Sequence, residues 1–132
     1  MIIEWKYRIA LKSDAVFETV KSVVGKRIPA ELKKFIGEHN AATPSIYRFM
    51  DGTSERVFGA VLDFNEDESD TDSVFTAIKV LNNRRFLPFG IDPFGNYICM
   101  DMVDKSIVLW DHETGSYNNV AVSLNDFLCL LY

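Results

Sequence analysis

Two short stretches in the last third of the chain carry residue types that could bind a metal ion or transfer protons. In the first, Asp92, Asn96 and Asp101 lie among apolar residues, and their side-chain oxygens are of the kind that binds calcium. A calcium loop spaces its ligands at alternate positions over about 12 residues and closes with Glu. Here Pro93 and Phe94 interrupt that spacing, and Asp101 lies one strand length away. We therefore expect Asp and Asn to stabilise a turn through nearby backbone groups, with no bound metal and no cofactor.

The second stretch, Asp111, His112 and Glu113, has the residue types of a general acid–base site. Adjacent residues on a strand point to opposite faces, so at most two of these three side chains could converge. Thr114 and Gly115 follow directly, which favours a solvated turn. The chain also lacks the G-x-S-x-G, H-E-x-x-H and phosphate-loop motifs of common enzyme classes. We expect no enzyme, and a small enzyme that uses these three residues is an alternative.

The charge of the chain is unevenly distributed. The net charge is −5, but residues 1–40 hold eight Lys/Arg against five Asp/Glu, a net of +3. Residues 41–132 hold six Lys/Arg against fourteen Asp/Glu, a net of −8. Nucleic-acid binders need a basic surface that neutralises phosphates. The acidic part of this chain would repel phosphate, so we expect no direct contact with nucleic acid and a preference for a basic partner.

The elements that must position these residues follow from the periodicity of the apolar residues. Helical spacing, with Gly25 after the first helix and Ser123 before the last, predicts helices over 13–25, 28–40, 73–84 and 123–132. Alternating or β-branched segments between turn residues predict strands over 45–50, 56–64, 85–91, 97–102, 106–110 and 117–122. Strands in groups joined by short turns indicate an α+β fold, a single mainly antiparallel sheet covered by helices, in one domain over residues 1–132.

Several helix ends and core residues can be named from the sequence. We expect Ser13 to cap the first helix, Pro29 to occupy the first position of the second, and Asn40 to end it. His39 is expected at that helix end, where the helix dipole favours a cation. The apolar faces predict a buried set that consists of Leu32, Phe35, Ile36, Phe58, Val61, Leu87, Phe89, Ile98, Leu109, Phe127 and Leu128.

The composition also suggests where the protein resides. Hydrophobic residues make up 48% of the 132-residue chain, which is typical of one globular domain. No apolar run approaches the roughly 20 residues that span a bilayer, and the first residues do not resemble a signal peptide. Cys99 and Cys129 lie in apolar patterns, which predicts free buried thiols. We therefore expect a cytoplasmic protein that does not contact membranes.

The order and spacing of four stretches resemble the SUKH superfamily over roughly residues 13–132. These stretches are the helix entry at Ile28-Pro29, the strand and turn from Leu87 to Asn96, the strand end at Trp110–Glu113, and the last helix from Ser123 to Leu128. Domains of this superfamily are related to a fungal cell-wall synthesis regulator, and many bacterial members resemble immunity proteins of polymorphic toxin systems. The resemblance implies an α+β fold and an immunity protein that neutralises a bacterial toxin by direct blocking, and does not imply an enzyme. A regulatory interaction module without a toxin partner is the alternative.

The acidic segment between residues 63 and 72 is the first candidate surface for a toxin. Nuclease toxins carry basic clefts that hold phosphate, so an acidic surface could enter such a cleft and speed association. A solvated loop without a partner is the alternative. We expect a basic, nuclease-type cognate toxin and a protein that is a monomer or a weak dimer. The expected partner-binding residues are Asp63, Glu66, Asp67, Glu68, Asp70, Asp72, Asp92, Trp110 and Asp111.

Overall fold

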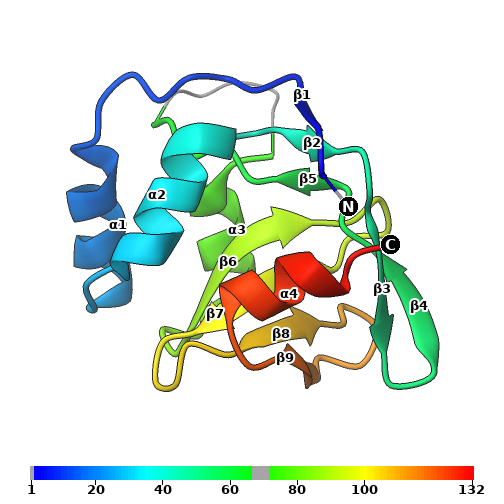
Figure 1. The fold of residues 1–132 in the computed structure, drawn as a ribbon. Coiled ribbons are helices and arrows are strands. Elements are labelled where there is room, and N and C mark those ends of the chain that lie inside the picture. The colour runs from blue at the N-terminus through cyan, green and yellow to red at the C-terminus, as the bar shows by residue number, and fades with distance from the viewer. Residues whose placement is uncertain (1, 67–71) are drawn as a thin grey trace.

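The computed structural model describes residues 2–66 and 72–132. In this part of the chain the helices are α1 Val16–Val24, α2 Ala30–His39, α3 Val74–Leu81 and α4 Leu124–Leu130. The strands are β1 Trp5–Lys6, β2 Thr43–Pro44, β3 Arg48–Asp51, β4 Ser54–Val57, β5 Ala60–Val61, β6 Phe86–Ile91, β7 Tyr97–Asp101, β8 Ile107–Trp110 and β9 Tyr117–Ala121. Their arrangement in space is shown in Figure 1.

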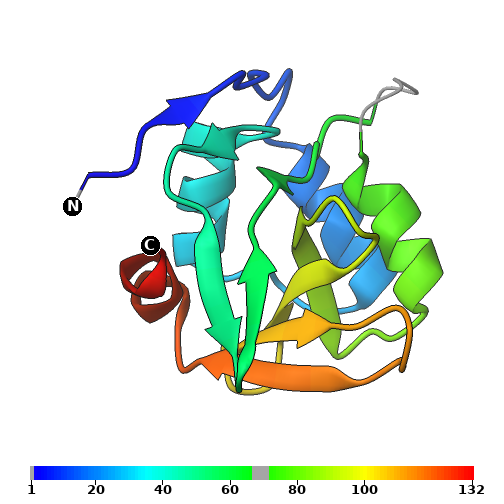
Figure 2. The same cartoon turned by 90° about the vertical axis from the view of Figure 1, so that its right-hand side faces the viewer.

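The sheets confirm the predicted α+β class and antiparallel pairing. Strands β5 to β9 form a five-stranded antiparallel sheet in the order of the chain. Two two-stranded sheets accompany this main sheet, in which β1 pairs with β2 and β3 pairs with β4. Figure 2 shows the β3–β4 hairpin as a separate layer in front of the larger sheet.

Gly59 divides the strand that the sequence predicts over residues 56–64. Its backbone N–H donates to the Ile91 carbonyl at 2.9 Å, and a Cβ at this position would lie 2.8 Å from that oxygen. Only glycine allows the two backbones to approach so closely. Residues before Gly59 therefore pair with β3, and residues after it pair with β6.

The ends of the helices follow local sequence signals with two exceptions. Ser73 and Ser123 each accept a backbone N–H of the helix that follows, and Gly25 ends α1 with a φ of 78°. The prediction that Ser13 caps the first helix is wrong, since α1 begins only at Val16 and Ser13 Oγ instead accepts the N–H of Ala15. Pro29, expected at the first helical position, directly precedes α2 as its N-cap residue.

The main core lies between one face of the larger sheet and the helices. Figure 1 shows α2 and α4 in front of this sheet. Every residue of the predicted buried set is buried except Leu128, which is partly buried against the core. Cys99 is buried as expected, but the prediction for Cys129 is wrong: it lies exposed on α4, opposite the stripe of Leu124, Phe127 and Leu131.

The last residues of the described chain hold the β3–β4 hairpin against this core. The backbone of Arg48 donates to the Tyr132 carbonyl at 3.0 Å, and the Tyr132 N–H donates back to the Arg48 carbonyl at 2.9 Å. The Phe127 ring meets the Phe49 ring edge-on at 5.2 Å and stacks on the Phe58 ring at 5.7 Å. The hairpin and α4 are therefore packed together although they are far apart in the sequence.

A buried polar cluster fixes the N-terminal segment. Asn40, Asp63 and Asn65 are each at most 5% exposed. The Asn40 amide donates to Asp63 Oδ1 at 2.9 Å and accepts the N–H of Phe64 at 2.8 Å. Asn40 and Asn65 also bind backbone groups of residues 9–12. This cluster joins the end of α2 to two distant segments through groups that are hydrogen-bonded rather than solvated.

Candidate protein-binding site

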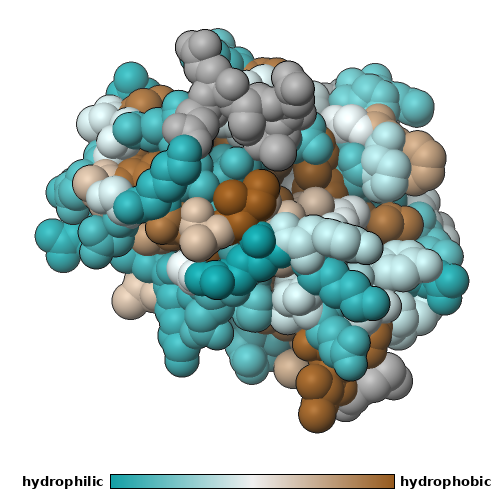
Figure 3. Space-filling model, turned by 90° about the horizontal axis from the view of Figure 1, so that it is seen from above, coloured by the Kyte–Doolittle hydropathy of each residue, from teal (hydrophilic) through white to brown (hydrophobic). Residues whose placement is uncertain are grey.

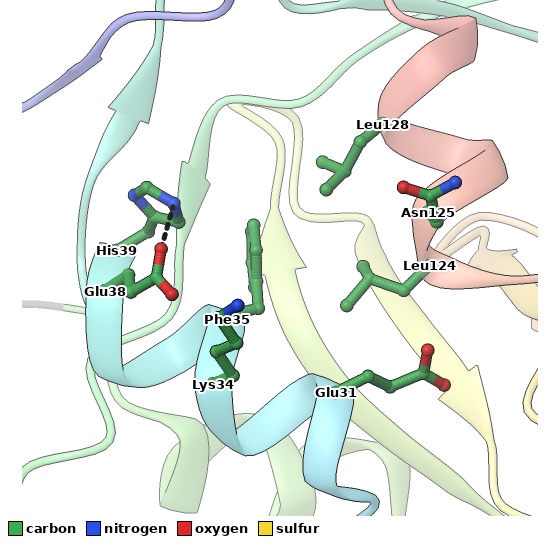
Figure 4. A pocket seen from close by; sticks show the side chains of 8 residues that line it. All are labelled: Glu31, Lys34, Phe35, Glu38, His39, Leu124, Asn125 and Leu128. Atoms are coloured by element: carbon green, nitrogen blue, oxygen red, sulfur yellow. Dashed lines mark ion pairs between the residues drawn. The ribbon is translucent and has the colours of Figure 1, made fainter.

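An open groove lies between α2 and α4 and has a volume of about 300 Å³. Figure 4 shows Leu124 and Leu128 from α4 facing Phe35 from α2 across it. The complete lining is Glu31, Lys34, Phe35, Glu38, His39, Leu124, Asn125 and Leu128. The groove therefore has an apolar floor between two helices and a polar rim.

Helical geometry explains why these residues share the groove. Glu31, Lys34 and Glu38 are spaced by three and four positions, so they lie on one face of α2. Leu124 and Leu128 are spaced by four positions on α4. Leu32 and Ile36 of α2 and Phe127 of α4 point into the main core, which fixes the two walls relative to each other.

The floor of the groove is held by aromatic contacts behind it. Phe35 meets the Trp5 ring edge-on at 5.4 Å and the Phe89 ring edge-on at 6.2 Å. Such edge-to-face pairs are favourable beyond the area that they bury. Phe35 is 7% exposed, so the floor is packed before any partner arrives.

His39, the last residue of α2, lines one end of the groove and contacts two neighbouring side chains. Its ring stacks on Trp5 at 4.5 Å, and its Nε2 lies 3.8 Å from Glu38 Oε2. Burial lowers the pKa of His39 below its ordinary value of 6.5, Arg8 lowers it further, and Glu38 partly opposes both. His39 is the last residue of α2, as predicted, and burial there disfavours its charged form.

We expect His39 to make folding stability depend on pH. As the pH falls below about 6.5, the unfolded chain binds a proton at His39 before the folded chain does, so the free energy of unfolding falls. The stabilising contribution is complete above that pH and is lost as the pH falls toward the lower, folded pKa. Urea unfolding between about pH 7.5 and pH 5.5 should show a smaller loss in His39→Gln than in the unmodified protein. Equal pH slopes for His39→Gln and the unmodified protein would contradict the role assigned to burial of His39.

The structure separates the residues of the predicted acidic surface. Glu66 and Asp72 are exposed, whereas Asp67, Glu68 and Asp70 lie outside the described residues. The expectation that Asp63 contributes to this surface is wrong, because Asp63 is 4% exposed and belongs to the buried polar cluster. Figure 3 views the molecule from the side of β1 and β2, where hydrophilic residues predominate and apolar ones form small separate spots.

Asp92 is also unsuited to direct contact with a partner, because it is 5% exposed within its turn. Its Oδ1 accepts the N–H groups of Phe94 and Asn96, and its Oδ2 accepts the Asn96 side chain at 2.7 Å. This confirms the predicted turn chemistry and leaves little of the Asp92 side chain accessible to a partner. Asp101 lies apart and binds Arg85 through both oxygens.

The residues of the possible acid–base site have different partners. Asp111 Oδ2 accepts a hydrogen bond from Arg56 at 3.1 Å, and Arg56 also contacts Asp51 at 3.3 Å. His112 Nδ1 lies 2.7 Å from the Asn96 side-chain oxygen, and Glu113 is exposed. Asp111 and His112 are thus held by different partners, Arg56 and Asn96, at the same end of the sheet.

Trp110 belongs to an aromatic face on the side of the sheet opposite the main core. The strand register places Phe86, Tyr97, Trp110 and Tyr117 on this face. Trp110 stacks on Tyr97 at 5.7 Å, and Phe86 stacks on Tyr117 at 4.0 Å. All four rings are partly buried, so the face offers aromatic edges near exposed turns.

Sequence reasoning names Trp110 but not its aromatic neighbours, and it misses the groove. The alternating pattern of each strand is visible in the sequence, but the contact between Phe86 and Tyr117, which lie on strands that do not pair, is not. In the described ranges, no group of three or more His, Cys, Asp or Glu could hold a metal ion. No helix among the described residues is long and apolar enough to cross a membrane.

Comparison with protein-family models matches residues 14–128 to the family SUKH_6, described as SMI1-KNR4 cell-wall. A comparison with curated proteins gave no match. The family match covers α1 to α3, all strands after β1, and α4 as far as residue 128. Since it spans most of the chain and agrees with the observed α+β architecture, the protein belongs to the SUKH_6 family within the SUKH superfamily.

Proposed function

We propose that this protein is an immunity protein that binds a cognate bacterial toxin and neutralises it by direct protein–protein blocking. The observation that carries the proposal is membership of the SUKH_6 family over residues 14–128, because many bacterial SUKH domains resemble immunity proteins. The groove between α2 and α4 supports it, since an apolar floor inside a polar rim is the usual anatomy of a protein interface.

The charge of the chain favours a basic toxin of the nuclease type. Residues 41–132 carry a net charge of −8, with fourteen Asp/Glu against six Lys/Arg. A cleft that holds phosphate must be basic, and opposite charges accelerate association by long-range attraction. Binding across such a cleft would exclude the nucleic acid, so inhibition needs no chemistry on the part of this protein.

A second candidate function is a regulatory interaction module without a toxin partner. The description of the matching family, SMI1-KNR4 cell-wall, favours this alternative. Both candidates require protein binding and differ in whether the partner is lethal by itself.

Co-expression separates these two functions. The protein encoded beside this gene is expressed from an inducible promoter with and without the present chain. The proposal requires that the neighbouring protein stops growth alone, that growth returns on co-expression, and that the two proteins co-purify. If the neighbour is harmless, or if rescue occurs without a complex, direct neutralisation of that protein is contradicted.

We expect the exposed carboxylates of the acidic surface to act mainly on the association rate. Replacing Glu66 and Asp72 with Ser should slow association with the toxin about two- to fivefold at low salt and flatten its salt dependence. Stability should change by no more than about 0.5 kcal/mol, because both side chains are exposed. Stopped-flow or surface-plasmon measurements at two salt concentrations give the rates.

A variant with the same change in net charge serves as the control. Glu4 and Asp14 are exposed in the N-terminal part of the chain, and their replacement with Ser should affect association less. Equal slowing by both pairs would show that only the total charge matters, and wild-type rates for Glu66/Asp72 at low salt would exclude this surface.

A further inference from the structure

We propose that the groove between α2 and α4 receives one large apolar side chain of the partner, flanked by Arg or Lys residues that meet Glu31 and Glu38. This inference rests on the proposed function only for the identity of the natural partner. The groove itself fixes the chemistry of the segment that it binds.

The floor sets the requirement for an apolar side chain. Phe35, Leu124 and Leu128 face the groove from two helices, and Leu128 is the one that keeps substantial exposure. The volume of about 300 Å³ lies at the lower end of the range for small-molecule sites, about 300–1,000 Å³. An opening of this size between two helices suits an inserted side chain, and such anchors dominate binding at protein interfaces.

The rim sets the requirement for flanking cations. Glu31 and Glu38 are exposed carboxylates seven positions apart, which is about two helical turns. Lys34 lies between them and is the one Lys or Arg among the lining residues. Two carboxylates against one ammonium give Glu31, Lys34 and Glu38 together a net charge of −1. The chain as a whole has a net charge of −5, so its electrostatic field also attracts a basic segment.

The same charges disfavour a second copy of this chain as the occupant. A symmetric dimer through the groove would bring Glu31 and Glu38 of one copy toward the same residues of the other. Like charges placed against each other oppose association, whereas cations of a different protein would be attracted. The geometry therefore points to a basic partner with an apolar anchor.

Selection from a phage-displayed library of random 12-residue peptides tests this chemistry without knowledge of the toxin. Immobilised protein should enrich peptides in which a large apolar residue is flanked by Arg or Lys. Asn125→Trp, which fills the groove from the exposed side of α4, should weaken binding of a selected peptide at least about 10-fold by fluorescence polarisation. Glu31→Lys should weaken it more at low salt than at high salt.

Glu113→Lys is the matched control, because it makes the same charge change at an exposed position outside the groove. It should leave peptide binding within about twofold, and helical circular dichroism should show that Asn125→Trp is folded. Enrichment of acidic peptides, no enrichment of basic apolar ones, or undiminished binding to both groove variants would overturn the proposal. A groove variant that loses the peptide but still protects cells would remove the groove from toxin binding and leave the proposed function intact.

Discussion

Replacing Phe127 with Ala should lower the free energy of unfolding by about 3–5 kcal/mol. Phe127 is fully buried, and its ring contacts the rings of Phe49, Phe58 and Phe89. Its removal leaves a cavity where α4, the hairpin and the larger sheet meet, and three rings lose a partner that the surrounding structure cannot readily replace. Urea unfolding followed by circular dichroism measures the loss, with an unchanged slope as the sign of an intact folded state.

Phe94 offers the same substitution outside the core. It is 69% exposed in the turn before β7, so Phe94→Ala should change stability by no more than about 0.5 kcal/mol. A loss below about 1.5 kcal/mol for Phe127→Ala would mean that the three layers do not share one packed core.

The second large loss of stability is expected at a polar residue. Asn40→Ala should destabilise the fold by about 2–5 kcal/mol, because the Phe64 N–H and the Ile9 carbonyl then lose the Asn40 side chain as hydrogen-bond partner. The change removes the bonds from Asn40 to Asp63 Oδ1, to the Phe64 N–H and to the Ile9 carbonyl. Asp63 Oδ1 loses one donor and keeps the N–H of Asn65, which lies 2.9 Å away. Thermal and urea unfolding at neutral pH measure the effect.

Asn119 provides the comparison, since it is exposed on β9. Asn119→Ala should be within about 0.5 kcal/mol of the unmodified protein. Hydrogen exchange adds a local test: the amide of Phe64 should lose protection in Asn40→Ala before the amides of β7 do. If Asn40→Ala is as mild as Asn119→Ala, the buried polar cluster does not hold the N-terminal segment.

The parts of the fold that depend on local chemistry could be predicted from the sequence. Ser73 and Ser123 cap helices because their hydroxyl oxygens reach the next turn of the same chain. Asp92 and Asn96 form their turn through contacts within five residues. The apolar periodicity of α2 and β6 places Leu32 and Phe89 in the core for the same reason.

The parts that depend on distant partners could not be predicted in this way. The sequence places Asn40 only at the end of a helix. In the structure its side chain donates a hydrogen bond to Asp63, which lies 23 positions away in the chain. β1 and β2 have two residues each, which is too short for any period to be visible. The groove joins Glu31 to Leu124, and no local pattern relates positions so far apart.

The packing of α4 against the hairpin has a consequence for the time at which this protein can complete its fold. Positions 58 and 127 are 69 residues apart, and the ribosome adds about 5–20 residues per second. Phe58 is therefore synthesised roughly 3–14 s before Phe127, the ring that covers it, and Phe49 is synthesised earlier still. Throughout that interval the nascent chain presents two aromatic side chains and an uncovered hairpin, so its greatest exposure to aggregation precedes the synthesis of its last helix.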